Sequence, residues 1–336
     1  MIRKFFLMEI SSKIIEWFEQ NKRDLPWRQT KDPYKIWISE IILQQTRVNQ
    51  GLGYYLRFLE RFPDLQSLAT SDRDDVMKMW EGLGYYSRAK NLHEGAKQIY
   101  FDRKGKWPGN FHEWLKIKGV GRYTAAAISS LCYGEKVPVV DGNVYRVISR
   151  IFGVADDISS NAAYNRFFLL AYHCMGYQNP ASFNEAMMEL GAMVCLPSQP
   201  VCIKCPVTRY CFAYTFNAYK VLPFSKRKNK SVIEEIYYAL IERDKKIALV
   251  KRDDSSIWKG LWELPRISGE IAKNAYILSK TTHLLTHKKL NIGFYKLKVE
   301  DLPKNIENSL VWKNKSGLKK LAFPKPVKEF LTQYLL

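Results

Sequence analysis

The sequence predicts an all-α domain followed by a small α+β domain within its 336 residues. Apolar residues recur at helical spacing from Ile10 to about Leu222. The next segment, Phe224–Ser231, is basic and almost free of apolar side chains. After it, apolar and polar residues alternate as they do in strands. We therefore expect a helical domain at residues 1–223, a linker at 224–231 and a second domain at 232–336.

The helical domain is predicted from segments whose apolar residues fall on one helical face. Clusters such as Trp107–Asn110, which combine Gly, Pro and Asn, separate these segments. The expected helices are Ile10–Glu19, Tyr34–Gln50, Tyr54–Arg61, Arg73–Met79, Ser87–Asp102, Arg122–Cys132, Val144–Ile151 and Ala162–Cys174.

The second domain is predicted from alternating segments with a helix at the end. Glu235–Ile241 and Lys246–Lys251 both alternate, and the four residues between them are typical of a hairpin. Asn291–Val299 is a further predicted strand, and Val327–Tyr334 is a predicted closing helix. This mixture indicates a small α+β fold.

The net charge of +20 favours a polyanionic partner such as nucleic acid. A proteome that is rich in Lys throughout would produce the same excess, so the charge alone leaves both explanations open. No apolar run is long enough for a membrane helix, and Met1–Lys13 is too short and too polar for a secretory signal. We therefore expect a cytoplasmic or nucleoid-associated protein without a membrane partner.

A glycine hairpin, Gly119-Val120-Gly121, stands directly before a predicted helix. Both glycines can adopt positive φ, and their exposed backbone N–H groups at a helix start favour an anion such as phosphate. Lys118 and Arg122 add positive charge on either side. A Gly-x-Gly helix start is common, so the hairpin alone is only moderately specific.

Four of the six cysteines lie in one short segment. Their spacing is Cys195-x6-Cys202-x2-Cys205-x5-Cys211. Four thiolates in one loop can enclose a single tetrahedral metal ion or an iron–sulfur cluster. A zinc site is not excluded by spacing, although the separations differ from the paired Cys-x2-Cys motifs that are usual for zinc.

Glu40 is an acid in the middle of an apolar helical segment. Burial of its carboxyl would raise its pKa, because desolvation disfavours the charged form, and a general acid at neutral pH needs such a shift. The simpler alternative is that Glu40 projects from the polar side of the helix beside Ser39. Gln45 is expected on the apolar face of the same helix.

The cysteine spacing, after a helix that ends at Val194, resembles the [4Fe-4S] loop of the endonuclease III superfamily of helix-hairpin-helix DNA glycosylases. The resemblance implies that the cluster shapes a basic loop against the DNA backbone, here with Lys204 and Arg209, and takes no part in catalysis. We therefore expect a [4Fe-4S] cluster as cofactor and DNA as partner.

The run Trp37–Thr46 resembles the adenine-specific branch of this superfamily, the MutY-type adenine DNA glycosylases. The resemblance implies that Glu40 protonates adenine and that Gln45 wedges into the duplex near the opposite base. Further positions that match this branch are Arg23, Trp27, Arg28, Tyr85 and Glu185. By the same resemblance, Trp27 and Glu185 belong to the adenine pocket, and Tyr85 inserts beside the partner base, since aromatic rings stack well on bases.

Tyr123 occupies the position after Gly-Val-Gly-Arg, where bifunctional endonuclease III-like enzymes carry a lysine. A phenol with a pKa near 10 cannot form a Schiff base with the sugar. The remaining route is hydrolysis by water without strand cleavage. The resemblance implies that Tyr123 and Asn143 help to position this water and Asp141.

Asp141 stands just before a predicted helix, in the motif Val140–Val144. A fixed carboxylate near the sugar would stabilise an oxocarbenium-like transition state, as in glycosidases. It is also a favoured helix N-cap residue, and the two roles are compatible. The motif resembles that of the family and favours catalysis. Lys118 departs from the proline that is common before the hairpin, which adds charge near phosphate.

Ser256–Pro265 resembles the start of the C-terminal domain of the MutY type, which is Nudix-like in fold. No Arg-Glu-x-x-Glu-Glu run follows, so we expect no pyrophosphatase activity. The family reads 8-oxoguanine through a Phe-Ser-His loop. Thr286 and His287 match the last two positions here, whereas Leu285 replaces the aromatic residue. A plain polar hairpin tip is the alternative for these residues.

The sequence thus predicts a monofunctional adenine DNA glycosylase that acts on adenine opposite 8-oxoguanine or guanine, and we expect a monomer. One alternative is an endonuclease III-like pyrimidine-damage glycosylase with lyase activity, which Tyr123 disfavours. Another is a non-catalytic iron–sulfur protein that binds DNA or transfers electrons, which the presence of Glu40 and Asp141 disfavours.

Overall fold

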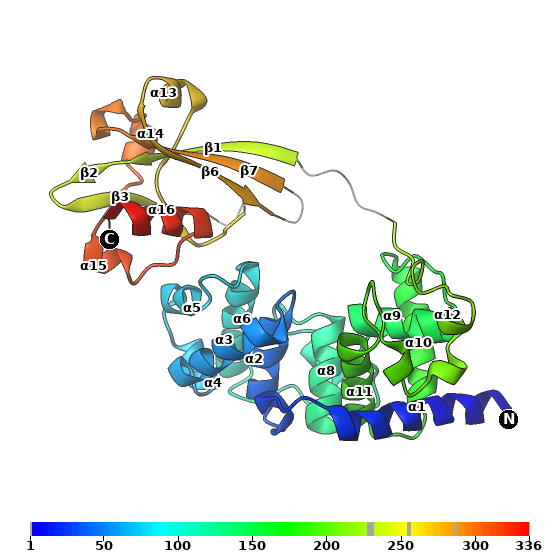
Figure 1. Ribbon diagram of the computed structural model, residues 1–336. Helices are drawn as coiled ribbons and strands as arrows, with labels where there is room; N and C mark the ends of the chain where they lie inside the picture. Colours follow the sequence, from blue (N-terminus) through cyan, green and yellow to red (C-terminus); the bar gives the residue numbers. More distant parts are fainter. Residues whose placement is uncertain (1, 227–231, 254–256, 286–287, 336) are drawn as a thin grey trace. The chain divides into compact units, whose positions relative to one another are not determined.

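The chain forms two compact units in a computed structural model that describes residues 2–226, 232–253, 257–285 and 288–335 (Figure 1). One unit joins Met1–Gly51 to Lys97–Arg227, and the other joins Leu52–Ala96 to Lys228–Leu336. The second unit therefore combines helices from the first part of the chain with the strands of the last part. Residues 227–231 of the predicted linker lie outside the described residues.

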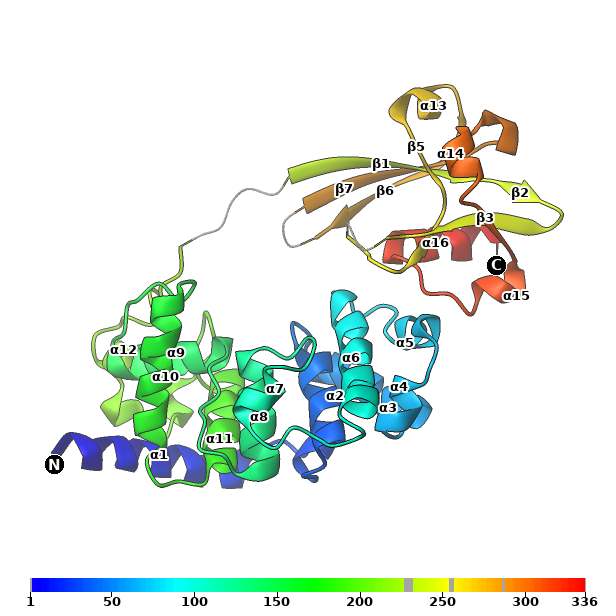
Figure 2. The ribbon, with the colours of Figure 1, turned by 180° about the vertical axis from the view of Figure 1, so that it is seen from behind.

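The first unit is helical. Four of its helices, α1, α9, α10 and α11, pack around a core that includes Ile148, Phe167 and Phe183. Figures 1 and 2 show α1 running past α10 and α11, which it contacts. The α-helices are α1 (Ile2–Asn21), α2 (Pro33–Leu43), α7 (Phe111–Trp114), α8 (Arg122–Tyr133), α9 (Gly142–Phe152), α10 (Asn161–Met175), α11 (Pro180–Met193) and α12 (Phe212–Thr215), with short helical turns at Pro26–Arg28, Gln98–Asp102, Cys202–Lys204 and Thr208–Tyr210.

The predicted single helix Tyr34–Gln50 is wrong, because the chain breaks it into two. α2 ends at Leu43, and α3 (Val48–Arg61) begins five residues later. Gln45 has a φ of 57°, which no residue inside a right-handed helix can adopt. The Gln44 side chain donates a hydrogen bond to Thr124 Oγ1 at 3.1 Å and so ties the break to α8. Gln45 is therefore exposed in a turn and does not lie on an apolar helical face.

The remaining helices of the second unit are short. Asp64 and Asp72 cap α4 (Leu65–Ala69) and α5 (Arg73–Met79) with their side chains. The prediction for Arg73–Met79 is confirmed with the same bounds. The expected helix Ser87–Asp102 is also present, as α6 (Ser87–Lys97) followed by the π-helical turn Gln98–Asp102.

The C-terminal part of the second unit contains two sheets and several helices. In one sheet the strand order is β5-β1-β7-β6, with β1 and β7 parallel, and in the other β3 lies between its partners β2, β4 and β8. Phe330 of α16 stacks on Phe294 of β7 at 4.0 Å, whereas Ala272 of α13 belongs to a separate apolar cluster. The elements are β1 (Val232–Leu240), β2 (Glu242–Arg243), β3 (Lys246–Lys251), β4 (Trp262–Glu263), β5 (Arg266–Ile267), α13 (Gly269–Lys273), β6 (Tyr276–Leu284), β7 (Lys288–Lys296), a turn at Val299–Asp301, α14 (Lys304–Glu307), β8 (Val311–Asn314), α15 (Lys315–Leu318) and α16 (Lys325–Leu335).

The predicted strands and closing helix are present, but the predicted hairpin is smaller than expected. Within the predicted hairpin, the two-residue strand β2 pairs with β3 around the turn at Asp244 and Lys245, which both have positive φ. The partners of β1 are β5 and β7. Alternation along a strand fixes which side chains face the core but does not name the neighbouring strand, which explains the difference.

Candidate active site

Glu40 is buried near the end of α2, with 6% of its surface exposed. Removal from water raises its pKa to about 7; the Tyr123 hydroxyl opposes this shift, and Asp141 and Glu185 add to it. Oε2 of Glu40 is buried without a hydrogen-bond partner among the described residues. The alternative in which Glu40 projects from a polar helix face is therefore wrong. A carboxyl that keeps its proton near neutral pH can serve as an acid.

Asp141 is the N-cap of α9. Its Oδ1 accepts a hydrogen bond from Val144 N at 2.7 Å, and its Oδ2 accepts one from Asn143 Nδ2 at 2.8 Å. Burial raises the pKa of Asp141, and these hydrogen bonds act against that shift. The capping role that the sequence allowed is thus present. Asp141 also interacts electrostatically with Glu40. The capping carboxylate therefore belongs to the same site as the Glu40 carboxyl.

Tyr123 lies on the first turn of α8 beside these two acids. Its hydroxyl is 3.7 Å from Met188 Sδ and also interacts with the Glu40 carboxyl. Burial, followed by the charges of Glu40 and Asp141, raises the pKa of Tyr123 well above its ordinary value. The side chain is therefore a neutral phenol, which can donate a hydrogen bond but offers no amine.

The glycine hairpin precedes α8, as expected, but its two glycines differ. Gly119 has a φ of 80°, which favours glycine, whereas Gly121 has a φ of −93° and is extended. Both glycines can adopt positive φ, but of the two only Gly119 does so in the structure. A Cβ at Gly121 would point into open space, so glycine there leaves the backbone accessible to a ligand. Lys118 and Arg122 beside it are exposed.

A cluster of charged side chains lies along the middle of α11. Arg28, on the turn after α1, places its Nε 3.3 Å from Glu185 Oε1. Arg23 and Arg28 both bind Glu189, a carboxylate that the sequence did not single out. Glu185 and Glu189 are four residues apart on an otherwise apolar helix, and this spacing is the signal that could have revealed the pair. Trp27 is buried beside Arg28 in the chain.

Arg146 connects Asn143 to the cysteine loop, and the sequence did not predict this role. Its Nη2 donates to Asn143 Oδ1 at 2.8 Å and to Gly191 O at 2.6 Å, and its Nε donates to Cys195 O at 2.6 Å. Since Asn143 in turn donates to Asp141, a continuous set of hydrogen bonds joins Asp141 to the start of the cysteine loop. Residue type alone cannot distinguish this arginine from a solvated one.

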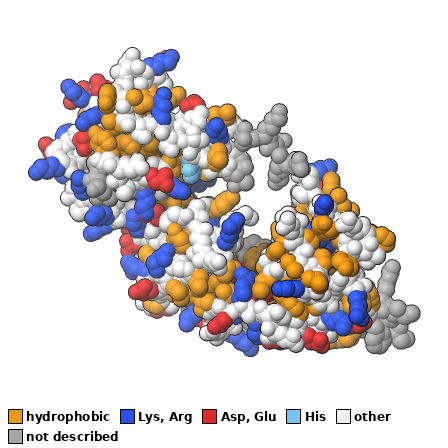
Figure 3. All heavy atoms as spheres, viewed as in Figure 1, with side chains coloured by type: hydrophobic (Ala, Val, Ile, Leu, Met, Phe, Trp, Pro, Cys, Tyr) orange, Lys and Arg blue, Asp and Glu red, His pale blue; other side chains and the backbone are white. Residues whose placement is uncertain are grey.

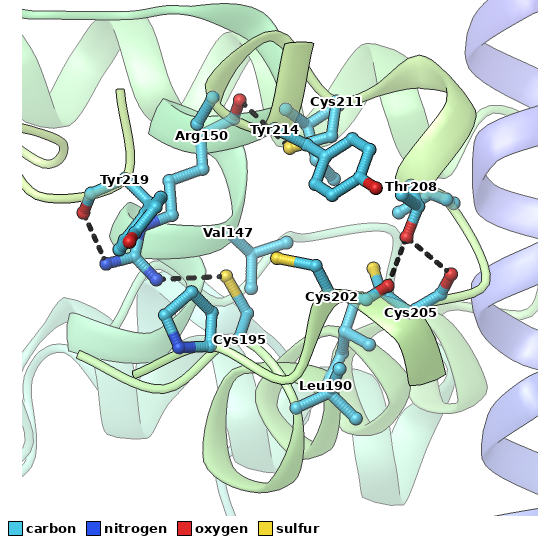
Figure 4. A pocket seen from close by; sticks show the side chains of 15 residues that line it. Val147, Arg150, Leu190, Cys195, Cys202, Cys205, Thr208, Cys211, Tyr214 and Tyr219 are labelled. Atoms are coloured by element: carbon cyan, nitrogen blue, oxygen red, sulfur yellow. Dashed lines mark hydrogen bonds between the residues drawn. The ribbon is translucent and has the colours of Figure 1, made fainter. Parts of the chain in front are cut away.

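The four cysteines lie around one cavity (Figure 4). Cys195, Cys202, Cys205 and Cys211 share this cavity with apolar side chains from α9 and α11. The buried Arg150 holds the surrounding loop by donating to the carbonyls of Leu196, Pro197, Tyr219 and Leu222. In the described part of the chain, no three His, Cys, Asp or Glu side chains are grouped as they would be around one ion.

The other predicted DNA contacts are on the surface of their units. Lys204 and Arg209 are exposed in the cysteine loop. Tyr85 is 50% exposed with a φ of 47°, and the Arg88 guanidinium lies 5.6 Å from its ring. Lys and Arg side chains are spread over the face drawn in Figure 3, in keeping with the net charge of +20. Thr286 and His287 lie outside the described residues.

Substitution of Gly191 by Ala is expected to destabilise the first unit, because α11 and α9 approach closely there. A Cβ at Gly191 would lie 2.5 Å from Asn143 Cβ and 3.0 Å from its Cα. Overpacking of this kind costs about 1–3 kcal/mol, and we expect a loss of this size in the free energy of unfolding, measured with urea. Gly53→Ala is the control, since its Cβ would meet only the end of the Arg57 side chain. Equal stability of the two variants would contradict the prediction.

The comparisons with known proteins agree with this arrangement. Residues 38–169 match the family model of the HhH-GPD superfamily base excision DNA repair proteins, and residues 236–333 match that of the NUDIX domain. The fold and the site thus define a base excision repair glycosylase with a Nudix-like domain. The chain is 31% identical to an adenine DNA glycosylase of Buchnera aphidicola subsp. Schizaphis graminum (strain Sg), over 96% of this chain and 97% of the relative. It is also 31% identical to an adenine DNA glycosylase of Mus musculus, over 87% and 71% of the two chains. The chain belongs to the adenine DNA glycosylase family.

Solved structures share the helical fold. A thermostable thymine-DNA glycosylase is 32% identical, with a TM-score of 0.57, and the match covers 64% of this chain and 97% of that one. Endonuclease III in a trapped covalent complex with DNA gives a TM-score of 0.56 at 18% identity, over 64% and 98% of the chains, which shows the fold alone. Within the described residues, no helix combines the length and the apolar character that a membrane span requires.

Proposed function

We propose that this chain is a monofunctional adenine DNA glycosylase that hydrolyses the N-glycosidic bond of adenine opposite 8-oxoguanine or guanine. The observation that carries the proposal is the pair of interacting acids, Glu40 and Asp141, with the phenol of Tyr123 beside them. The pair supplies an acid for the leaving base and an anion for the sugar. The phenol stands where lyases of the superfamily carry a lysine.

The chemistry follows from the two protonation states. The target adenine leaves the base stack, because its glycosidic bond cannot be reached inside the duplex. The Glu40 carboxyl donates its proton to the adenine ring, which makes the base a better leaving group. Asp141, in its ionised form, stabilises the positive charge that develops on the deoxyribose. Water then attacks the sugar carbon and passes a proton to the Glu40 carboxylate, which restores the acid. Tyr123 and Asn143 help to orient this water.

Recognition of adenine is assigned to the charged cluster and Trp27. Arg28 and Glu185 present a donor and an acceptor beside one another, which suits the edge of a purine. The proposed lyase alternative needs an amine at Tyr123, and the binding-only alternative gives no reason to bury Glu40.

Contact with DNA is assigned to surfaces of both units. In the first, the open backbone at Gly121 and the exposed Lys118 and Arg122 suit phosphates. In the second, Tyr85 lines a groove of about 690 Å3 with Trp258, His283 and Leu285. Gln45 and Tyr85 are proposed to enter the duplex near the partner base. Reading of 8-oxoguanine by Thr286 and His287 remains a prediction from the sequence.

The cysteine cavity fits a [4Fe-4S] cluster, which the four thiolates would hold. Four sulfur donors around one space, enclosed by apolar walls and the cationic Arg150, suit a polynuclear cluster better than a single zinc ion. The cluster would supply structural support to the loop that carries Lys204 and Arg209. We further propose that the protein is a cytoplasmic, nucleoid-associated monomer.

One assay separates the three candidate functions. Duplex DNA with adenine opposite 8-oxoguanine is incubated with the protein and then divided, with and without alkali. Strand breaks only after alkali support hydrolysis. Breaks without alkali, with an intermediate that borohydride traps, support the lyase. The absence of abasic product supports binding alone.

The same assay with guanine opposite adenine tests the second domain. A ratio near unity between the rate for adenine opposite 8-oxoguanine and the rate for adenine opposite guanine would mean that the domain with Leu285 does not read the lesion.

The pH dependence of base release follows from the pKa of about 7 at Glu40. Glu40 must be protonated to act, so the single-turnover rate constant is expected to fall by up to about tenfold per pH unit above that value. At low pH the rate also falls as Asp141 takes up a proton. Rate constants measured from about pH 5 to about pH 9 check both limbs. A flat alkaline limb would contradict the acid role of Glu40.

A further inference from the structure

We propose that Glu189 is a positioning residue of the base pocket, which holds the Arg28 guanidinium in the orientation that presents its Nε to Glu185. The inference rests on the proposed function, because it assigns Arg28 and Glu185 to the adenine pocket. Glu189 itself touches neither the substrate site nor solvent, since only 1% of its side chain is exposed.

Glu189 is saturated by the two arginines. Its Oε1 accepts hydrogen bonds from Arg23 N at 3.0 Å, Arg23 Nε at 2.8 Å and Arg28 Nη1 at 3.0 Å. Its Oε2 accepts from Arg23 Nη2 at 2.5 Å and Arg28 Nη2 at 2.9 Å. The pKa of Glu189 is lowered to about 2, because the hydrogen bonds from Arg23 and Arg28 outweigh the opposing effect of burial. The group is therefore an anion over the whole working range of pH.

These contacts leave only the Nε edge of the Arg28 guanidinium to face Glu185. Both terminal nitrogens bind Glu189, and Nη1 also donates to Arg23 O at 3.0 Å. The guanidinium carbon lies 5.2 Å from the centre of the Phe18 ring, which limits movement out of this plane. The Nε edge remains, and it faces Glu185 Oε1 at 3.3 Å. Glu189 thus sets where the positive charge and the donor of Arg28 stand.

The position of Arg28 also affects the pKa values of Glu185 and Glu40, because its charge acts on both carboxyls. Burial raises the pKa of Glu185, and Arg28 is the largest influence against that shift. Arg28 also lowers the pKa of Glu40, whereas Glu185 raises it. Release of Arg28 would therefore change the pocket carboxylate and the acid together. The two glutamates lie one helical turn apart and differ in exposure: 20% of the Glu185 side chain is exposed, against 1% of the Glu189 side chain.

The test is Glu189→Gln, which keeps the size of the side chain and removes its charge. We measure single-turnover release of adenine opposite 8-oxoguanine as the enzyme concentration is increased. The maximal rate constant is expected to fall by about 10- to 100-fold, since hydrogen bonds to charged groups are lost, while the half-saturating concentration changes by less than about threefold. A purely structural defect would lower the fraction of active enzyme and leave the rate constant of that fraction unchanged. An unchanged rate constant overturns the proposal.

A double-mutant cycle shows whether Glu189 acts through Arg28. In an Arg28→Ala background, Glu189→Gln is expected to have little further effect, and simple addition of the two losses overturns the proposal. Glu189→Asp retains the charge on a shorter side chain, so its rate constant is expected between those of the wild type and the Gln variant. If the Gln variant does not fold, the Asp variant replaces it as the test. A rate constant of the Asp variant equal to that of the wild type then overturns the proposal.

Glu113→Gln is the matched control, because it removes an ion pair with Arg103 on another helix of the same unit. Its rate constant is expected to equal that of the wild type, and an equal loss in this control overturns the specific role of Glu189. Absence of adenine release by the wild type itself would overturn the proposed function instead, so the two failures are distinguishable.

Discussion

Replacement of Glu40 by Gln is expected to reduce single-turnover release of adenine by about 10²–10⁴-fold, the range that general acids contribute. Gln has nearly the same shape as protonated Glu, so the packing in α2 is kept while the transferable proton is lost. Because Glu40 is buried, the change should not alter the surface that meets the duplex. Affinity for the duplex, measured by fluorescence anisotropy, is therefore expected to change little.

Glu16→Gln provides the control for Glu40→Gln. Glu16 is exposed on α1, in the same unit, and the same chemical change there should leave the rate constant unaffected. If Glu40→Gln kept the wild-type rate constant, Glu40 would not be the acid. If it lost DNA affinity and release in parallel, its role would be structural.

Asp141→Asn is expected to lower the rate constant for base release by about 10²–10³-fold, as loss of one preorganised electrostatic interaction does in other enzymes. Asn is as good an N-cap as Asp, and its carbonyl oxygen can still accept the hydrogen bond from Val144. The capping contribution to the free energy of unfolding should therefore be kept, and only the hydrogen bond from Asn143 to Oδ2, worth about 0.5–1.5 kcal/mol, is lost. This separates the charge of Asp141 from its capping role. Quenched-flow measurement of adenine release, together with urea denaturation, checks both statements.

Asp72→Asn is the matched control for this second variant. Asp72 caps α5 in the same way, with its side chain accepting from Asp74 N at 2.7 Å, and it lies in the other unit. Normal release by the Asp72 variant and impaired release by the Asp141 variant would assign the effect to the position of the charge. A wild-type rate in Asp141→Asn would refute the electrostatic role.

The features that could be predicted from the sequence are those that depend on composition within one segment. The cysteine spacing, the acid inside an apolar segment and the glycine before α8 are all local, and the structure contains each of them. Helical periodicity likewise predicted α5 with its observed bounds. The burial of Glu40 was one of two alternatives that the sequence left open, and the apolar Ile36, Trp37 and Ile41 near it favoured burial.

The features that could not be predicted depend on one backbone angle or on distant partners. A positive φ at Gln45 divides one periodic segment into α2 and α3, and periodicity does not register a single residue. Glu189 and Arg146 owe their roles to groups up to 166 residues away, such as the Arg23 guanidinium. The parallel pairing of β1 with β7 also joins segments far apart in the chain.

The left-handed turns at Gln45 and Tyr85 limit how this protein can change during evolution. Neither residue is a glycine, so each turn stores conformational strain, and a Gly substitution would relieve it. Selection for thermal tolerance alone would therefore favour the loss of both side chains. Each of the two side chains that are proposed to enter the duplex therefore stands at a position where a non-glycine residue costs stability.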